Sequence, residues 1–382
     1  MVSLPKLCLN MIVKDEAHII EERLTSLLSK IKFDYYVICD TGSSDNTKEI
    51  MKNTFDKFHL QGEFYDHTWS DFGTNRTLAL QAAFGKSEYL LIFDADDEII
   101  GNINIPEKLT YDKYNLKFGD SFTYYRPLLV NNRKSWKFIG VLHEYLATNE
   151  ISTNESVIEG DYFLVSGKSG NRSKDPEKYI KDGKILEKAY HDVFESDHAL
   201  ACRYAFYAAQ SFKDAGEEYR NVAIDWYTKV INLNNWNQEK FYSCIMIGDL
   251  HPDLLYRLKH YLKSIEYDSE RIEGIVKACE LASNNGLHSL VYSLYNTYKN
   301  YRLNTKNKLF MFSDLYNDNL EYYFTISAFY INKSEEGYHV SKKIIENNRL
   351  EKNLLEQVFK NLNFYKLYIY QDNSFSLFNS LN

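Results

Sequence analysis

The sequence is poor in proline and cysteine. Its 382 residues include 5 Pro and 5 Cys. The cysteines are scattered through mostly apolar segments and form no CxxC pair, so they indicate buried free thiols rather than a disulfide framework or a zinc site. We therefore expect a globular protein of a reducing compartment.

The sequence also lacks an excess of positive charge and any long apolar run. Lys and Arg number 45 against 53 Asp and Glu, a formal net charge of −8, and basic residues are not clustered. Nucleic acid is therefore not expected as a partner, because phosphate binding needs a basic surface. No window approaches about 18 consecutive apolar residues, and the N-terminus lacks the basic and apolar regions of a signal peptide. We expect a cytoplasmic protein without a transmembrane segment.

What is present over the first 100 residues is an alternation of apolar strands and amphipathic helices. Strands are expected at 7–13, 35–39, 63–69 and 89–93, with helical patterns at 20–31, 50–58 and 74–84. This alternation predicts an α/β fold with a parallel, doubly wound sheet, in which ligands bind outside the carboxyl ends of the strands. Asp40 and the segment 94–96 stand at two of these ends.

The predicted secondary structure changes twice in the rest of the chain. Residues 101–165 predict antiparallel strands and loops, with the main pieces at 122–130 and 136–147, and the pattern is helical from about Pro176 onward. The segment 204–218 has a distant echo at 322–336, and each is followed by a second helical pattern, as in helical hairpin repeats. We expect an α/β domain over 1–190 and an all-α, repeat-like domain over 191–382.

The acidic segment after the fourth strand carries the chemistry. Asp94 and Asp96 can both approach one hard cation, with substrate phosphates and water as further ligands. A cation that bridges a diphosphate neutralises it as a leaving group. An isolated DxD is more often a solvated acidic turn, but the position at the carboxyl end of a strand favours the cation site.

Several motifs now combine into a family resemblance. Their sequences are NMIVKDE at 10–16, DTGSSDNT at 40–47, GTNR at 73–76 and DAD at 94–96. Their order and spacing resembles family 2 glycosyltransferases of the GT-A fold, over about residues 5–190. The GVLHE segment at 140–144 is similar to the GxxHE element of the subgroup with tetratricopeptide-like helical repeats. The segment 165–176 also resembles that subgroup, although Ser166 stands where many relatives have His.

The resemblance implies a nucleotide-sugar site. Val13 and Glu16 would line the base and the ribose, and Asp40 would accept a hydrogen bond from the base. Arg76 would lie near the diphosphate or brace the carboxylates. The alternatives are a helix-capping turn residue for Asp40 and an exposed helix residue for Arg76.

The cation would be Mn²⁺ or Mg²⁺. The resemblance makes Asp96 its main ligand and places Asp94 nearer the ribose, with Ala95 between them in the nucleotide-sugar site. His143 is a second candidate ligand, because a neutral imidazole binds manganese-like ions well.

Two carboxylates are candidates for the catalytic base. Glu144, beside His143, could take the proton from an attacking acceptor hydroxyl. Asp97 is the alternative base because it adjoins the DxD segment, and a purely structural His–Glu pair is the alternative for 143–144.

A glycine-spaced basic loop follows at 167–172. Lys168 and Arg172, together with backbone N–H groups, suit a diphosphate, and such a loop could close over the donor. A plain flexible linker explains the segment about as well.

We therefore expect a metal-dependent glycosyltransferase that moves a sugar from a UDP- or GDP-sugar to a hydroxyl of a glycan, peptide or lipid-linked acceptor, and the family resemblance implies inversion. The helical half would bind the acceptor or form a homodimer. One alternative is an inactive, transferase-like helical-repeat scaffold, which the intact Asp94/Asp96 and His143/Glu144 pairs disfavour. A nucleotidyltransferase would need a Gly-rich phosphate loop where the residues VKDE stand at 13–16.

Overall fold

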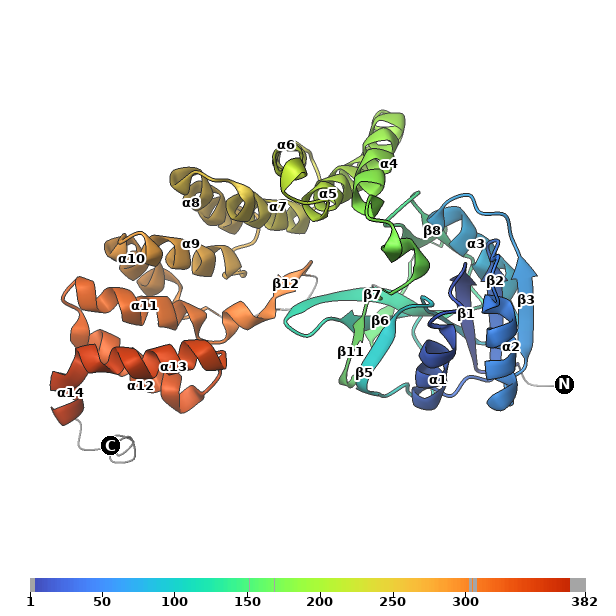
Figure 1. The fold of residues 1–382 in the computed structure, drawn as a ribbon, viewed down its shortest axis with the longest axis horizontal. Coiled ribbons are helices and arrows are strands. Elements are labelled where there is room, and N and C mark those ends of the chain that lie inside the picture. Colours follow the sequence, from blue (N-terminus) through green and yellow to red (C-terminus); the bar gives the residue numbers. More distant parts are fainter. Residues whose placement is uncertain (1–3, 151, 168, 302–303, 305–307, 372–382) are drawn as a thin grey trace. The chain divides into compact units, whose positions relative to one another are not determined.

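The computed structural model describes residues 4–371 except 151, 168, 302–303 and 305–307. The chain forms two compact units, residues 1–223 and 224–382 (Figure 1). The domain boundary expected at 190/191 stays a prediction, since compact units need not coincide with domains.

The first unit is built on a mixed sheet whose strands follow the order β3-β2-β1-β4-β7-β6-β11-β5. Its first four strands run parallel to one another. They are β1 (Leu7–Val13), β2 (Tyr35–Asp40), β3 (Gly62–Asp66) and β4 (Tyr89–Ile92). These are the predicted strands, although β3 ends earlier than expected. The register pairs Val13 with Asp40, so the carboxyl ends of β1 and β2 lie side by side.

The second half of the sheet is mainly antiparallel. β7 pairs antiparallel with both β4 and β6, and β11 pairs antiparallel with β5. These strands are β5 (Glu98–Ile103), β6 (Lys113–Phe118), β7 (Phe122–Asn131), β10 (Glu155–Val157, beside β6) and β11 (Gly160–Val165). The predicted piece 136–147 is a separate hairpin of β8 (Trp136–Ile139) and β9 (Tyr145–Thr148). Its connecting loop, residues 140–144, holds the GxxHE segment.

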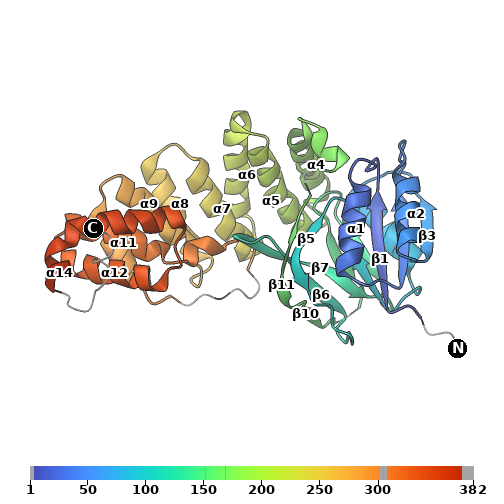
Figure 2. The ribbon, with the colours of Figure 1, turned by 60° about the horizontal axis from the view of Figure 1, so that its bottom comes forward.

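Helices cover both faces of the parallel strands because successive strand residues point to opposite faces. Leu9 and Met11 of β1 pack in the core that includes α1 (Ile20–Lys30) and α2 (Thr47–Lys57) (Figure 2). Cys8 packs on the opposite face with residues of α3 (Phe72–Ala83). Asn10 points to this second face and donates hydrogen bonds to the carbonyls of β2 and α3, which ties the three elements together.

Two further helices belong to the first unit. They are α4 (Lys178–Val193) and α5 (His198–Asp214), which pack against each other. The N-terminus of α5 is capped by Asp197, whose Oδ1 accepts a hydrogen bond from the N–H of Leu200 at 3.0 Å. The next helix, α6 (Arg220–Asn232), begins at the end of this unit.

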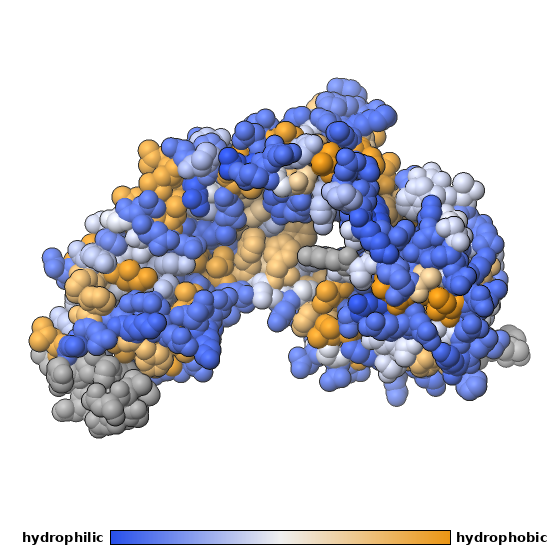
Figure 3. Space-filling model, viewed as in Figure 1, coloured by the Kyte–Doolittle hydropathy of each residue, from blue (hydrophilic) through white to orange (hydrophobic). Residues whose placement is uncertain are grey.

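The second unit is helical, as the sequence predicts. Its helices are α7 (Asn237–Leu250), α8 (Leu254–Lys263), α9 (Glu273–Asn284), α10 (His288–Tyr298), α11 (Asn319–Tyr330), α12 (Ser334–Asn347), α13 (Lys352–Asn361) and α14 (Lys366–Gln371). Among them, α11 and α12 pack against each other and contain the predicted echo with its second helix. The surface over α12 and α13 is mostly hydrophilic in Figure 3. No helix in the described part of the chain is long and apolar enough to cross a membrane.

The cysteines lie in the cores of both units. All are buried, as expected from their apolar surroundings, and none forms a disulfide within the described residues: Cys8, Cys39, Cys202, Cys244 and Cys279. Burial raises the thiol pKa of Cys8, Cys39, Cys244 and Cys279 to about 12. These thiols are therefore protonated at neutral pH.

Candidate active site

Asp40 closes the turn that follows β2. Its Oδ1 accepts hydrogen bonds from the N–H groups of Gly42 (2.8 Å) and Ser43 (2.7 Å). Gly42 has a φ of 104°, which favours glycine at this position. Asp40 is 5% exposed, and its second oxygen, Oδ2, has no hydrogen-bond partner among the residues that the structure describes. One carboxylate oxygen is thus structural and the other is available to a ligand.

The other predicted residues of the nucleotide site lie at the ends of the neighbouring strands. Val13 is buried, and its carbonyl accepts a hydrogen bond from the N–H of Thr41 at 2.9 Å. Ala95, just beyond β4, is buried in the same core. The ends of β1, β2 and β4 therefore form one edge of the sheet, with Asp40 on one side of β1 and the DxD segment on the other.

Arg76 of α3 joins two carboxylates. Its Nη2 lies 2.6 Å from Asp94 Oδ1, and its Nε lies 2.6 Å from Glu144 Oε1. Arg126 of β7 approaches Asp94 from the other side, with 3.6 Å between Nη1 and Oδ2. Of the two roles expected for Arg76, the structure shows the bracing of carboxylates.

Two cations set the charge state of Asp94. Burial alone would raise its pKa, but Arg76 and Arg126 outweigh burial and hold the pKa of Asp94 below its ordinary range. Burial likewise opposes the charge of Arg76, while Asp94 and Glu144 raise the pKa of its guanidinium. The ionised bridge is therefore the stable form at neutral pH.

Asp96 and Glu16 face the backbone of the segment 169–172. The N–H of Gly170 donates to Asp96 Oδ2 at 3.3 Å, and the N–H of Asn171 donates to the Glu16 carboxylate at 3.2 Å. Burial and the nearby charge of Asp94 raise the pKa of Asp96. Burial also raises the pKa of Glu16 to about 6, although the N–H of Asn171 opposes this shift. Both carboxyls thus lie where a positive charge would stabilise them.

Asp97 is the most deeply buried of the acidic cluster. It is 4% exposed, its Oδ1 accepts a hydrogen bond from the N–H of Gly167 at 3.1 Å, and its Oδ2 has no partner within the described residues. Burial and the charge of Asp94 raise the pKa of Asp97 to about 8. This carboxyl is therefore mainly protonated at pH 7.

His143 lies in the hairpin loop between β8 and β9. Its ring stacks on Tyr207 of α5 with 4.1 Å between centroids and 7° between planes. The surrounding protein atoms and the charge of Arg203 lower the pKa of His143, so the imidazole is neutral at pH 7 although the residue is exposed. In this form the ring can act as a ligand.

The residues predicted for the diphosphate are only partly described. Lys168 lies outside the described residues. The guanidinium of Arg172 forms an ion pair with Asp182 and lies 4.9 Å from the ring centroid of Phe72. Ser166, where relatives have His, has its hydroxyl 3.2 Å from the hydroxyl of Tyr124.

The described residues do not form a complete protein cage for a cation. Within the described ranges, no group of three or more His, Cys, Asp or Glu side chains could hold a metal ion. Asp96 supplies hard carboxylate oxygens, which suit Mn²⁺ or Mg²⁺ when phosphates and water complete the coordination. The residues present therefore fit a cation that arrives with a diphosphate.

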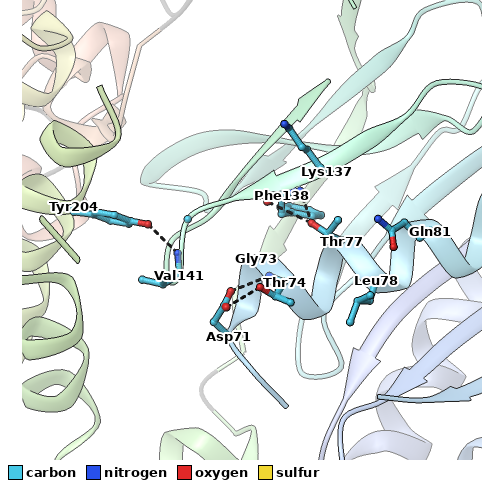
Figure 4. Close-up of a pocket in the computed structure, with 11 residues that line it drawn as sticks. Asp71, Gly73, Thr74, Thr77, Leu78, Gln81, Lys137, Phe138, Val141 and Tyr204 are labelled. Carbon is cyan, nitrogen blue, oxygen red and sulfur yellow. Dashed lines mark hydrogen bonds between the residues drawn. The ribbon is translucent and has the colours of Figure 1, made fainter. Parts of the chain in front are cut away.

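A groove runs along one face of α3. It has a volume of about 420 Å³ and lies between α3 and the segment 137–141, with Tyr204 at one end (Figure 4). Thr77 Oγ1 accepts a hydrogen bond from the N–H of Phe138 at 2.9 Å and joins the two walls. A second cavity of about 290 Å³ shares Gln81 with the first and extends toward Trp136.

Sequence reasoning missed two features of the site. Arg126 lies within a strand pattern, and no feature of the sequence distinguishes it there from an ordinary surface arginine. Arg203 and Tyr204 of α5 contact the loop 140–144, although they lie in the region expected to form helical repeats. Only the three-dimensional contacts reveal these residues.

Comparison with known structures gives distant likenesses. A mannosyltransferase, PcManGT from Pyrobaculum calidifontis in complex with GDP-Man and Mn²⁺, shares 12% identity over 69% of this chain and 88% of that chain, with a TM-score of 0.33. TarS residues 1–349 from S. aureus, in complex with UDP-GlcNAc, share 16% identity over 69% of this chain and 90% of that chain, with a TM-score of 0.33. At so low a TM-score neither likeness carries a conclusion. No curated protein matches the chain.

The comparison with protein families is specific. Residues 8–165 match the family model described as Glycosyl transferase family 2. The match runs from β1 to β11 and includes the four motifs at 10–16, 40–47, 73–76 and 94–96. The N-terminal part of the chain thus matches glycosyl transferase family 2, so the protein is a glycosyltransferase, and helices follow the matched part.

Proposed function

We propose that this glycosyltransferase uses a divalent cation and a UDP- or GDP-sugar, and that it transfers the sugar to an acceptor hydroxyl with inversion. The observation that supports this most is the sheet edge itself. There Asp40 and Asp96 flank the end of β1, each with a carboxylate oxygen that the protein leaves open or holds with a single N–H.

The donor side follows from Asp40. Its free Oδ2 can accept the ring N–H of uracil or guanine, and adenine and cytosine offer no such ring donor. A hydrogen bond to an ionised carboxylate is stronger than one between neutral groups, so this contact would select the base. Val13 and Glu16 would line the base and the ribose, as the family resemblance implies, and Ala95 would lie in the same nucleotide-sugar site.

The cation side follows from Asp96 and His143. Asp96 would be the main ligand of Mn²⁺ or Mg²⁺, and the neutral imidazole of His143 a second. Such a cation would neutralise charge that develops on the diphosphate as it leaves. Arg172 and Lys168 would bind the diphosphate, which requires Arg172 to exchange its ion pair with Asp182 for the phosphates.

The acceptor side follows from Glu144. Its carboxylate would take the proton of the acceptor hydroxyl as the hydroxyl oxygen bonds to the anomeric carbon. The bond from that carbon to the diphosphate oxygen breaks on the opposite face, so the configuration inverts. Arg76 Nε lies 2.6 Å from Glu144 Oε1 and fixes this carboxylate in place. Asp97 is the alternative base, but the charge of Asp94 and its own burial favour its protonated form.

Hydrolysis of a panel of nucleotide sugars with Mn²⁺ and no acceptor tests the donor assignment. We expect slow hydrolysis of a UDP- or GDP-sugar. If calorimetry detects no nucleotide binding and no donor is hydrolysed, the inactive scaffold is the better interpretation.

The base assignment needs a separate comparison. Glu144→Gln should bind nucleotide normally and lose transfer, mainly in kcat. If Asp97→Asn shows this loss and Glu144→Gln does not, the base is Asp97.

A further inference from the structure

The loop that carries His143 and Glu144 is not held by its own secondary structure. Residues 140–144 lie between β8 and β9 without ladder pairing. Gly140 has a φ of 115° and His143 a φ of 52°. A left-handed residue other than glycine persists only where its surroundings fix it. Contacts from other elements must therefore determine the conformation of this loop.

Helix α5 supplies several of these contacts. The N–H of Val141 donates to the phenolic oxygen of Tyr204 at 3.0 Å, and Figure 4 shows this hydrogen bond across the end of the groove. Arg203 Nε donates to the carbonyl of His143 at 2.9 Å. The ring of His143 lies flat on Tyr207, at the stacking distance given above. One face of α5 thus holds the backbone and the imidazole of the loop.

Arg203 is itself held in place. Its guanidinium lies 4.8 Å from the ring centroid of Tyr207 and 5.3 Å from that of Tyr145, the first residue of β9. Tyr204 is 2% exposed, so its hydroxyl cannot move far. The donor, Arg203 Nε, and the acceptor, the Tyr204 hydroxyl oxygen, are therefore both held in place by the protein itself.

Helix α3 holds the loop from the other side. A Cβ atom at Gly73 would lie 2.3 Å from the carbonyl oxygen of Gly140, so only glycine allows this approach. Arg76, one turn later on α3, binds the carboxylate of Glu144. The loop is thus fixed at its start and end by α3 and at its centre by α5.

We propose that Tyr204 and Arg203 are positioning residues for Glu144 and His143, so that α5 is part of the catalytic machinery. The inference rests on the proposed function in one respect, the role of Glu144 toward the acceptor. A displacement of about 1 Å in a catalytic group can cost about 100-fold in rate. Contacts that fix Glu144 would therefore appear mainly in the turnover of transfer, and contacts that fix His143 would also appear in the cation-dependent part of donor affinity.

Tyr204→Phe is the sharpest test because it removes only the oxygen that accepts the Val141 N–H. We expect kcat for transfer to fall about tenfold, the scale of one lost hydrogen bond, and nucleotide affinity to fall by much less. Tyr219→Phe is the matched control: Tyr219 stacks on Phe212 of the same helix, and its ring makes no contact with the loop among the described residues. In the Glu144→Gln background, Tyr204→Phe should cause no further loss, since residues that act through one another are not additive.

A second readout does not depend on activity. With ¹⁵N-histidine labelling, His143→Gln identifies the imidazole signals of His143 among those of the 10 histidines. Tyr204→Phe and Arg203→Gln should shift these signals, and Tyr219→Phe should not.

The outcomes separate the two proposals. Unchanged His143 signals in Tyr204→Phe, or an equal loss of nucleotide affinity and kcat, would overturn the positioning role. If no nucleotide sugar is turned over by the wild type, the proposed function fails, while the His143 signals still decide whether α5 positions the loop.

Discussion

Replacing Arg76 with Met should loosen the first unit around α3 and the β8–β9 hairpin. Methionine is similar in length and polarisable, but it leaves Asp94 and Glu144 without the guanidinium that lies 2.6 Å from each. Breaking a buried ion pair by removing one partner costs about 3–5 kcal/mol. Asp94 keeps Arg126 at 3.6 Å and is partly solvated, so we expect the lower end, about 3 kcal/mol.

Native-state hydrogen exchange on peptides from α3 and β8–β9 measures this cost locally. Since each 1.4 kcal/mol is about a tenfold change in an equilibrium constant, exchange through opening should become about 100-fold faster. The exchange rate of Arg76→Lys should lie between those of wild type and Arg76→Met, because one ammonium group cannot reach both carboxylates as the guanidinium does. Arg133→Met, which removes an exposed pair with Glu88, is the control and should change exchange less than threefold.

The same experiment has a predictable pH dependence. Arg76 and Arg126 hold the folded-state pKa of Asp94 below its unfolded value of about 3.9. A depressed carboxyl pKa contributes stability above the unfolded pKa, and that stability is lost as the pH falls through the folded pKa. The difference in the free energy of local opening between wild type and Arg76→Met should therefore be largest near pH 7 and should become smaller below about pH 4. Exchange in Arg76→Met within threefold of wild type at pH 7 would refute the bridge.

Three further predictions concern the carboxylates. Asp96→Asn should lose cation-dependent nucleotide binding and most activity while its circular dichroism spectrum stays unchanged; near-normal turnover would contradict the cation assignment. Asp40→Ala should weaken nucleotide binding by about 1–3 kcal/mol, measured by calorimetry, and equal affinities would leave Asp40 as a turn residue only. The pKa of Asp97 is about 8 in the folded protein and about 4 in the unfolded chain, so the free energy of unfolding falls as the pH rises from about 4 to 8. Asp97→Asn should therefore raise the urea midpoint of the ligand-free protein most at pH 8, and an advantage that grows toward pH 4 would contradict this.

Local patterns account for much of the first unit. Continuous apolar runs predicted β1, β2 and β4 because strands buried on both faces have no polar side, and the spacing of apolar residues predicted α1 to α3. The strand β3 was predicted three residues too long at its end, because Trp69 seemed to extend the strand pattern, whereas the pairing with β2 ends at Asp66.

The site was predictable only where the chemistry is local. The DxD segment and Asp40 follow strands directly, so sequence position indicates the sheet edge. Arg126 and Tyr204 act through contacts with residues distant in sequence, and no local pattern distinguishes them from other strand and helix residues. Helix pattern alone grouped α5 with the repeats, and this pattern does not reveal the contacts of α5 with the loop 140–144. The role of such residues depends on packing that the sequence does not display.

Alkylation of the buried cysteines can report partial unfolding of the protein without an added label. A thiol with a pKa of about 12 is almost entirely protonated at pH 8, and it is shielded from alkylating reagents until its surroundings open. Cys8 and Cys39 lie on adjacent parallel strands of the sheet, and Cys244 and Cys279 lie on α7 and α9 of the helical unit. Pulsed alkylation followed by peptide mass spectrometry would therefore time the opening of the transferase sheet and of the helical unit separately, in one unmodified chain.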